Sequence, residues 1–290
     1  MDIFVTGASG WIGSAVVPEL IAAGHGVVGL ARSDEAAARI TSLGARARRG
    51  DLADLAGLTE AAAESDGVVH LGYHHDFAQM AEAAELDRGA LTAFGDALAG
   101  TGKPLLFASG LIGVSHEDDR PAEGGHPRVA SAAHAFALAD RGVRVVAMRF
   151  APTVHGQGDY GFVAELARVA RERGVSTYVG DGANVWPAVH VSDAGRLVTL
   201  ALAGAPAGSA VHAVAEEGVP TKAIAEAIGR GLAVPTESIP ESEATEKLGW
   251  IGMFFARDLR ASSEQTRTTL GWEPTGPTLL EDLDAGHYTA

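Results

Sequence analysis

The sequence contains no cysteine, which excludes disulfide bonds, zinc-thiolate sites and a cysteine nucleophile. Basic residues are scarce, since 22 Lys and Arg stand against 37 Asp and Glu, for a formal net charge of −15. This balance argues against nucleic acid or an anionic membrane surface as a partner. Neither a signal peptide nor an apolar run long enough to span a bilayer is evident. We therefore expect a cytoplasmic protein that acts on a small molecule.

What the sequence does contain is enough apolar material for a large core. Its 290 residues are 47% hydrophobic and 20% charged, which suits one large α/β domain or a core domain with a smaller one attached. Apolar strands alternate with helical patterns over the first 150 residues. This alternation predicts βαβ crossovers and a parallel sheet. The strands expected there are residues 3–5, 27–31, 45–49, 67–71, 104–109 and 143–150.

The pattern loosens after residue 150. Hydrophobic periodicity predicts helices at residues 162–173, 191–203, 221–232 and 279–285. A stretch rich in Gly and Asn at residues 178–187 is typical of a loop. In the first helix of the chain, Pro18 should kink the helix or shift its start.

Three glycines at a spacing of three follow the first predicted strand directly. Gly7 allows a sharp turn, Gly10 lets the backbone approach a pyrophosphate, and Gly13 lets the next helix pack on the strand. Amides at a helix N-terminus attract an anion. The position between strand and helix favours a dinucleotide site over a merely tight turn. The residues predicted to contact the cofactor here are Gly7, Ser9, Gly10, Trp11, Ile12 and Gly13.

The end of the second strand indicates which dinucleotide is bound. An NAD site usually has Asp or Glu there, whereas this chain has Arg32 and Ser33, and an arginine suits a 2′-phosphate. NADP(H) is therefore favoured over NAD(H), with an ordinary solvated arginine as the alternative. Asp51 and Leu52, after the third strand, fit the adenine edge, although Asp51 fits a turn or helix cap equally well.

These motifs resemble the extended short-chain dehydrogenase/reductase family, also called the NAD-dependent epimerase/dehydratase family. The stretches that carry the resemblance are residues 6–13, 50–52, 69–72, 107–109, 149–156, 180–184, 189–193 and 270–274. The resemblance implies an α/β fold with a Rossmann-type, doubly wound parallel sheet and a smaller C-terminal substrate lobe. We expect a dinucleotide-binding domain over residues 1–155, to which residues 188–215 return. An interleaved lobe would cover residues 156–290.

The resemblance also implies roles near the nicotinamide and shows where the chain departs from the family. Leu71, Gly72, Pro152 and Val154 would lie beside the nicotinamide half of the cofactor. The family pairs a tyrosine proton donor with a lysine four residues later, where the lysine depresses the tyrosine pKa. The corresponding positions here are Arg128 and Ala132, and neither is a proton donor of that kind.

Another group must then supply the proton in any reductase reaction. Tyr73 follows the fourth strand at the sheet edge where ligands bind in open α/β sheets, although it also suits a pocket wall. Ser109 occupies the family's serine position and could polarise a carbonyl, or simply cap backbone at a strand end. Further candidates for the proton donor are His74, His155, Tyr160 and His190. The residues expected in the substrate pocket are His74, His155, Tyr160, Asn184 and Trp186. Trp186 fits a packing anchor equally well.

Together these features predict an NADP(H)-dependent oxidoreductase that transfers hydride to a small carbonyl or activated double bond. A non-catalytic nucleotide-binding sensor or scaffold is one alternative, and an epimerase or isomerase that uses bound nucleotide is another. No metal is expected, because His74, His75 and Asp76 are adjacent and lack a matched set of ligands. A homodimer is an expectation from the family alone.

Overall fold

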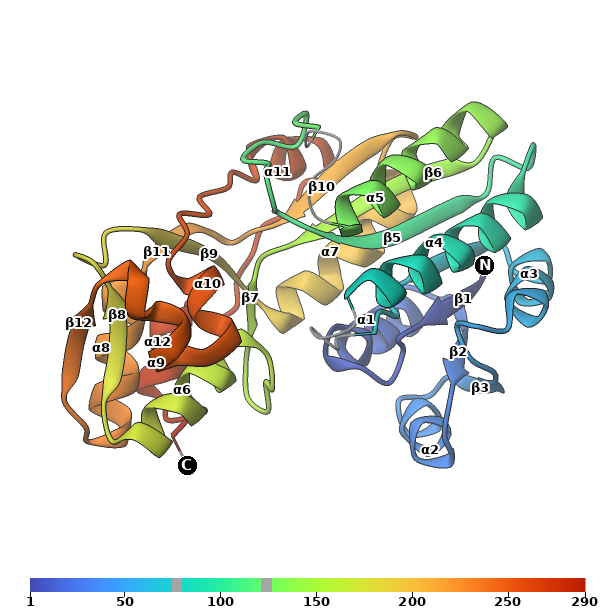
Figure 1. The fold of residues 1–290 in the computed structure, drawn as a ribbon. Helices are drawn as coiled ribbons and strands as arrows, with labels where there is room; N and C mark the ends of the chain where they lie inside the picture. The colour runs from blue at the N-terminus through green and yellow to red at the C-terminus, as the bar shows by residue number, and fades with distance from the viewer. Residues whose placement is uncertain (75–79, 121–126, 290) are drawn as a thin grey trace. The chain divides into compact units, whose positions relative to one another are not determined.

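The computed structural model describes residues 1–74, 80–120 and 127–289 and divides the chain into two compact units (Figure 1). Unit 1 consists of Met1–Arg149, Ala194–Val211 and Glu264–Trp272. Unit 2 consists of Phe150–Asp193, His212–Ser263 and Glu273–Ala290. The chain therefore passes repeatedly between the units. The return of Glu264–Trp272 to unit 1 had no signal in the sequence.

Unit 1 is built on a seven-stranded sheet with the strand order β10-β6-β5-β4-β1-β2-β3. Parallel registers join β1 to β2 and β4, β2 to β3, and β4 to β5. The order reverses direction beside β1, as expected for a doubly wound sheet. The predicted fold class is confirmed. The strands are β1 Asp2–Thr6, β2 Gly26–Ala31, β3 Arg46–Arg49, β4 Gly67–His70, β5 Pro104–Gly110, β6 Arg144–Phe150 and β10 Ser209–Ala213.

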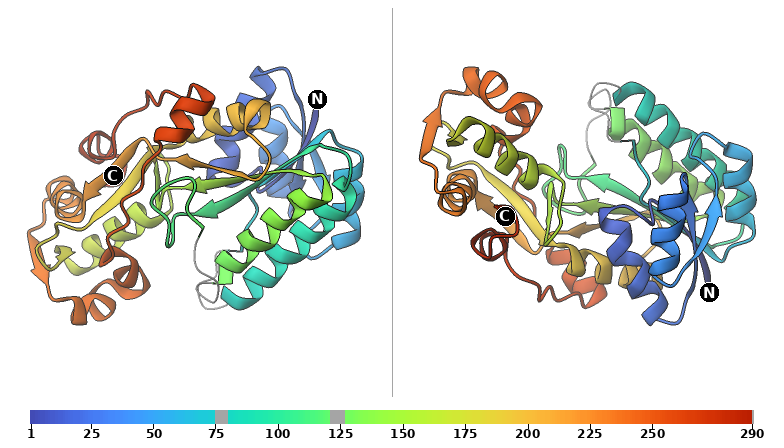
Figure 2. Two further views of the ribbon diagram at one scale, coloured as in Figure 1. Left: turned by 90° about the horizontal axis from the view of Figure 1, so that it is seen from above. Right: turned by 90° about the horizontal axis from the view of Figure 1, so that it is seen from below.

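Helices cover both faces of this sheet, with α4 and α5 on one face and α1 and α7 on the other (Figures 1 and 2). The core beneath α4 and α5 includes Phe4, Leu91 and Phe94, all fully buried. Burial on both faces explains why the central strands β1, β4, β5 and β6 read as apolar runs rather than as alternating patterns. The helices of this unit are α1 Trp11–Ala22, α2 Asp34–Ser42, α3 Leu55–Ala63, α4 Met80–Leu98, α5 Pro127–Ala137, α7 Val191–Gly204 (from Ala194 on) and α11 Glu264–Leu270, with the 3₁₀ helix Leu138–Arg141 after α5.

The first helix accommodates the proline that was expected to disturb it. Helix α1 begins at Trp11 and continues through Pro18 to Ala22, so Pro18 does not shift its start. Pro18 lies on the exposed face of the helix. Water can therefore bind the carbonyl that loses its helical partner, and the proline ring meets no packed neighbour.

Unit 2 contains two small sheets and a set of short helices. One sheet has the order β11-β9-β7, with β7 parallel and β11 antiparallel to β9, and the other pairs β8 with β12 in parallel. Its strands are β7 Thr153–His155, β8 Ser176–Val179, β9 Val185–His190, β11 Glu216–Pro220 and β12 Thr236–Ile239. Its helices are α6 Phe162–Arg173, α8 Thr221–Leu232, α9 Ala244–Leu248, α10 Gly252–Phe255 and α12 Leu279–Asp284, together with the 3₁₀ turns Glu241–Glu243 and Gly249–Ile251.

The predicted loop at residues 178–187 is wrong, whereas the predicted bounds of α6 and α8 are confirmed. The stretch contains the end of β8 and the start of β9, joined by a turn in which Gly180 and Gly182 both have positive φ. The partners of β9 come from residues 153–155 and 216–220, far away in the sequence. A strand this short, with Pro187 inside it, carries too little alternation to be distinguished from a loop.

Among the described residues, every helix is too short or too polar to cross a bilayer.

Candidate functional site

The turn after β1 is packed so closely that two of its positions, Gly7 and Gly13, have no room for a side chain. Gly7 has φ +68°, and a Cβ added there would lie 2.7 Å from the carbonyl carbon of Leu71 and the amide nitrogen of Gly72. A Cβ on Gly13 would overlap the carbonyl oxygen of Gly7. Both contacts are with backbone, which cannot swing aside as a flexible side chain could. Glycine is therefore required at these two positions by packing alone.

Gly10 is different, because the fold alone does not require glycine there. Its φ is −77°, which any residue adopts, and an added Cβ would meet only the carbonyl oxygen of Gly7, at 3.1 Å. Gly10 is the N-cap of α1 and offers no side chain to the first amides of the helix. Ser9, Trp11 and Ile12 are partly exposed around it. The start of α1 therefore offers an accessible backbone surface with the positive end of the helix dipole.

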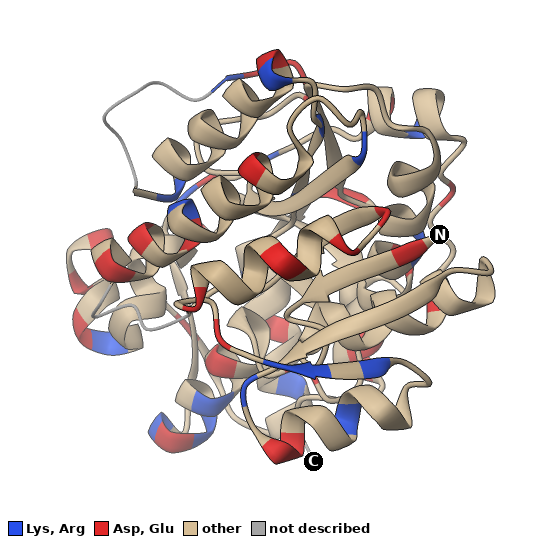
Figure 3. Ribbon diagram, turned by 90° about the vertical axis from the view of Figure 1, so that its right-hand side faces the viewer, with Lys and Arg blue, Asp and Glu red and all other residues tan. Residues whose placement is uncertain are grey.

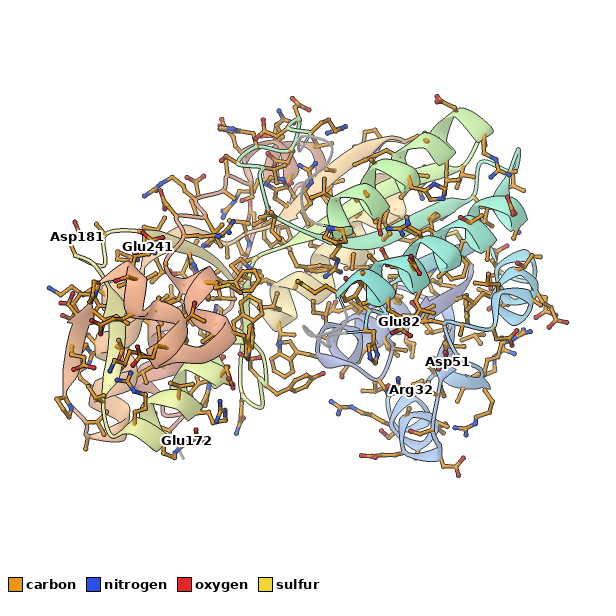
Figure 4. The ribbon with its side chains drawn as sticks, in the orientation of Figure 1. Arg32, Asp51, Glu82, Glu172, Asp181 and Glu241 are labelled. Carbon is orange, nitrogen blue, oxygen red and sulfur yellow. The ribbon has the colours of Figure 1, made fainter. Side chains whose placement is uncertain are left out.

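The ends of β2 and β3 lie at the same edge of the sheet, where Arg32 and Asp51 are located (Figure 4). Arg32 is exposed, and no described residue pairs with its guanidinium. Its neighbours are engaged: Arg49 pairs with Asp34 at 3.4 Å, and Arg48 pairs with Glu60 of α3 and with Glu64, which caps that helix. In Figure 3 the arginines of β3 form a basic stretch on an otherwise largely uncharged sheet. This edge is therefore suited to an anion.

Ser33 and Asp51 both have local structural roles at this edge. Ser33 is the N-cap of α2, and its Oγ accepts a hydrogen bond from the amide of Ala36 at 3.1 Å. Asp51 Oδ1 accepts from the amide of Ala53 at 2.9 Å. The turn alternative for Asp51 is thus present in the structure, and the half-buried Leu52 follows it.

A buried hydrogen-bond chain connects the glycine turn to α4. The amide of Gly72 donates to Thr6 Oγ1 at 3.0 Å, and this hydroxyl lies 2.6 Å from His70 Nδ1. The other ring nitrogen of His70, Nε2, lies 3.1 Å from Asp87 Oδ1. A neutral ring in this setting accepts from Thr6 at Nδ1 and donates Nε2–H to the carboxylate. This series of hydrogen bonds fixes the ends of β1 and β4 against α4.

Asp87 keeps its charge although it is buried. Burial alone would raise the pKa of its carboxyl group, but the hydrogen bond from His70 and the nearby charge of Arg128 hold that pKa below its usual value. Sequence reasoning missed this residue. The signal was available, because Asp87 lies on the buried stripe of α4, one turn from Ala83, Ala84, Ala90 and Leu91. An acid on the apolar face of a helix indicates a partner inside the protein.

Arg128 of α5 contacts two strand ends at once. Its guanidinium carbon lies 4.0 Å from the centre of the Tyr73 ring, and its Nη2 donates to the carbonyl of Ala108 at 3.4 Å. Tyr73 follows β4, and Ala108 is followed in β5 by Ser109. Since β4 and β5 pair in parallel, with His70 opposite Phe107, their carboxyl ends meet at one edge. The two catalytic candidates, Tyr73 and Ser109, thus lie on neighbouring strand ends connected through Arg128.

The charges around Tyr73 act in opposite directions. Burial raises the pKa of its phenol, the cation of Arg128 lowers it, and the anion of Asp87 raises it again. Burial also lowers the pKa of Arg128, an effect that Asp87 and Tyr73 oppose. An arginine retains its proton under these conditions. The phenol is therefore next to a permanent positive charge.

His74 is exposed beside Tyr73, and residues 75 and 76 of the His-His-Asp run lie outside the described residues. In the described part of the chain, no three His, Cys, Asp or Glu residues form a group that could hold a metal ion.

The candidates of unit 2 are mostly engaged in structure. His155 is fully buried, with Nδ1 2.6 Å from Asp282 Oδ2, whereas Tyr160 is 67% exposed. The amide of Asn184 donates to the carbonyls of Phe255 and Arg257 at 2.8 and 3.1 Å. Trp186 is fully buried in the core of this unit. The polar atoms of both side chains thus bond to residues 254–257, and the full burial of Trp186 fits the packing alternative, while the pocket role of Asn184 stays a prediction. Val154 is buried in β7, and Pro152 is half-buried before it.

Comparison with known proteins identifies the family. The sequence model of the NAD dependent epimerase/dehydratase family matches residues 3–111. The "Uncharacterized protein C2A9.02" of Schizosaccharomyces pombe is 44% identical over 298 residues, which cover 99% of this chain and 100% of that protein. The chain belongs to the NAD-dependent epimerase/dehydratase family. The "Uncharacterized protein YLL056C" of Saccharomyces cerevisiae is 45% identical over 295 residues, covering 99% of each chain.

Solved structures with this family's fold align over nearly the whole chain. A dTDP-glucose 4,6-dehydratase from Streptomyces venezuelae, with NAD bound, has a TM-score of 0.77 at 21% identity and covers 99% of this chain and 96% of its own. A UDP-glucose 4-epimerase from Thermus thermophilus, in complex with NAD, has a TM-score of 0.75 at 23% identity and covers 99% and 98%. At these identities the likeness establishes the fold.

Proposed function

We propose that the chain is an NADP(H)-dependent oxidoreductase that reduces a small carbonyl or activated double bond. The observation that carries the proposal is the glycine turn at residues 7–13, where packing excludes side chains at Gly7 and Gly13 and an uncapped helix start is accessible at Gly10. The space beside Gly10, which a side chain at this position would fill, lies at the positive end of a helix and therefore fits a pyrophosphate. The family's name and the NAD bound in its neighbours support the same cofactor class.

The residues that would hold the cofactor lie along one edge of the sheet. The backbone from Gly7 to Gly13 would bind the pyrophosphate, and Arg32 would bind the 2′-phosphate that distinguishes NADP from NAD. Asp51 and Leu52 would lie at the adenine, and Leu71 and Gly72 beside the nicotinamide half. Pro152 and Val154 remain predictions for that half. When bound, the cofactor supplies a hydride.

The chain's own part in the reaction is to position the acceptor and to give it a proton. Ser109 would hydrogen-bond the carbonyl oxygen, which orients it and polarises the bond. Tyr73 would give its phenol proton to the carbonyl oxygen as the acceptor is reduced to an alcohol. The tyrosinate left behind would take a proton back from solvent. Tyr73 follows β4 and Ser109 lies near the end of the neighbouring parallel strand β5, at the edge where ligands bind in open α/β sheets.

A nucleotide-binding sensor without turnover is the second candidate. The observation in its favour is that Arg128 and Ala132 stand where the family's tyrosine and lysine are expected. The two proposals separate in one experiment, in which the protein is mixed with NADPH and a panel of small aldehydes, ketones and enones. Consumption of NADPH that falls at least about tenfold in Tyr73→Phe supports the oxidoreductase. A raised melting temperature with NADPH and no turnover of any panel member supports the sensor.

A further inference from the structure

The cation beside Tyr73 comes from α5, the helix that would carry the family's lysine, but from a different position on it. Arg128 occupies, on α5, the place where the family has its tyrosine, yet its side chain lies over the ring of a tyrosine that follows β4. A guanidinium carbon 4.0 Å from a ring centre is a close cation–π contact. Tyrosine and cation are therefore both present in this chain, but on two different elements.

The position of Arg128 is fixed from two sides. Its Nη2 donates to the carbonyl of Ala108 in β5, at 3.4 Å. The carboxylate of Asp87 attracts the guanidinium and is itself held by His70 at 3.1 Å. A buried guanidinium is costly unless charges and acceptors surround it. The His70–Asp87 pair thus connects the glycine turn, through Thr6, to the charge beside the phenol.

We propose that Arg128 is a positioning residue for Tyr73, which holds the ring at the sheet edge and stabilises the phenolate left when Tyr73 gives up its proton. The inference rests on the proposed oxidoreductase function and goes beyond it, because it assigns the role of the missing lysine to an arginine one turn earlier on the same helix. In the step concerned, the O–H bond of Tyr73 breaks as the O–H bond of the product alcohol forms. The hydride comes from the reduced nicotinamide, and solvent restores the proton.

The surroundings of the phenol explain why a cation is required. Around the ring the structure places Arg128 from α5 and Asp87 from α4, with His70 of β4 behind Asp87, while His74 next in the chain is exposed. Burial and Asp87 both disfavour a phenolate, and Arg128 opposes them. Without Arg128, transfer of the proton would leave an uncompensated anion beside a carboxylate.

The test that decides the inference needs no substrate. Tyrosinate absorbance is titrated against pH in the parent chain and in Arg128→Gln, and the Tyr73→Phe version of each is subtracted so that only the Tyr73 phenol remains. We expect this phenol to titrate at higher pH in Arg128→Gln and close to the parent value in Arg128→Lys, which keeps a cation. An unchanged titration in Arg128→Gln overturns the inference.

Arg120 provides a matched control, because its guanidinium carbon lies 4.6 Å from the ring centre of Phe136, on the helix that carries Arg128. Arg120→Gln removes a cation from a ring without a phenol, so the Tyr73 titration should not move. A shift as large as that in Arg128→Gln means that any lost arginine perturbs the fold, and this overturns the inference. Circular dichroism and a melting curve verify that each variant is folded. Arg128→Met serves as a second neutral variant if Arg128→Gln does not fold.

A kinetic arm separates this inference from the proposed function. For carbonyl reduction, kcat/KM falls as pH rises through the pKa of the acid, since the acid must be protonated. Arg128→Gln should lower kcat/KM about tenfold at neutral pH. In the pH profile of kcat/KM, the fall on the alkaline side (the alkaline limb) should move to higher pH. If no carbonyl is turned over, the proposed function fails while the titration still decides the role of Arg128. If kcat/KM falls with an unmoved limb and an unmoved titration, the inference fails and the function stands.

Discussion

The pair His70–Asp87 in unit 1 and the pair His155–Asp282 in unit 2 have the same chemistry. Each joins the end of a strand to a helix, and all four side chains are buried. Their neighbours differ. Beside Asp87 is Arg128, a permanent cation, whereas beside Asp282 are two more imidazoles, those of His190 at 3.9 Å and His287 at 3.3 Å. We infer that the role of a buried His–Asp pair depends on the third side chain beside it, which is Arg128 in unit 1 and a histidine in unit 2.

In unit 1 the third group faces a candidate catalytic side chain. The Arg128 guanidinium lies over Tyr73, and Thr6 connects His70 to the amide of Gly72. In unit 2 the pair holds the C-terminal segment. Asp282 lies on α12, and nearby Tyr288 donates to Asp159 at 2.9 Å and accepts from the amide of Gly156 at 3.2 Å. We therefore expect damage to the first pair to alter the phenol, and damage to the second to alter stability alone.

The sharpest test of this contrast exchanges each carboxylate for an amide. Asp87→Asn should lower the free energy of unfolding by about 4 kcal/mol, because the Arg128 cation loses its counter-charge. Asp282→Asn should lower it by about 2 kcal/mol, because the buried hydrogen bond with His155 is weakened. Urea denaturation measures both losses. Only Asp87→Asn should move the Tyr73 titration, to lower pH, since an anion that raises the pKa of the phenol is removed. An equally large shift of the Tyr73 titration in Asp282→Asn would contradict the difference between the two pairs.

The next largest effect is expected at the hydroxyl between the glycine turn and His70. Thr6→Val keeps the shape but leaves the amide of Gly72 and Nδ1 of His70 without their partner, at a cost of about 2 kcal/mol. NADPH binding should weaken with it, because the turn loses its connection to β4. The matched change in unit 2 is Thr221→Val, where a buried hydroxyl donates to Asn184 at 2.7 Å. This control should lose stability and keep its NADPH affinity.

A smaller effect is expected at the exposed end of β2. Arg32→Ala should weaken NADPH binding about tenfold and leave NADH binding nearly unchanged, because a charged hydrogen bond to the 2′-phosphate is lost. Titration calorimetry with both nucleotides measures the ratio. Equal weakening would remove Arg32 from the choice of cofactor. Arg46→Ala, on the exposed edge strand β3, serves as the control.

The smallest effect concerns pH and unit 2. Burial lowers the pKa of His155 below its ordinary value of 6.5, although Asp282 opposes this shift. Since the folded pKa lies below the unfolded one, the stability contribution is present above about 6.5 and is lost as pH falls. We expect a loss of up to about 1 kcal/mol between about pH 7 and 5.5. His155→Gln should flatten this slope, and a slope of the opposite sign would contradict the direction of the shift.

The parts of the molecule that were predictable from sequence are those with local causes. Helices α6 and α8 have their expected bounds because their apolar periodicity is strong and Gly174 ends α6 with positive φ. The glycine turn follows from spacing, since its contacts lie within Gly7–Gly13 and the neighbouring strand. Strand β9 was not predicted, because its evidence is pairing with distant residues.

The site was predictable only in part, for the same reason. Tyr73 and Ser109 were found from their places after predicted strands. Their connection through Arg128 depends on how α5 packs against the edge of the sheet, which no local pattern encodes. Asp87 was missed because a single acid in an alanine-rich helix resembles a solvated position until burial is known. Trp186 was assigned equally to pocket and core, and its full burial decides for the core.

The central claim is that the accessible backbone at Gly10 binds a pyrophosphate. Gly10→Ala tests it most directly, because φ −77° suits alanine and the added Cβ meets only one atom, at 3.1 Å. We expect calorimetry to detect NADPH binding to the parent chain. Gly10→Ala should melt within a few degrees of the parent and bind NADPH at least about tenfold more weakly. No heat with NADPH or NADH in the parent, or undiminished binding in a folded Gly10→Ala, would contradict it.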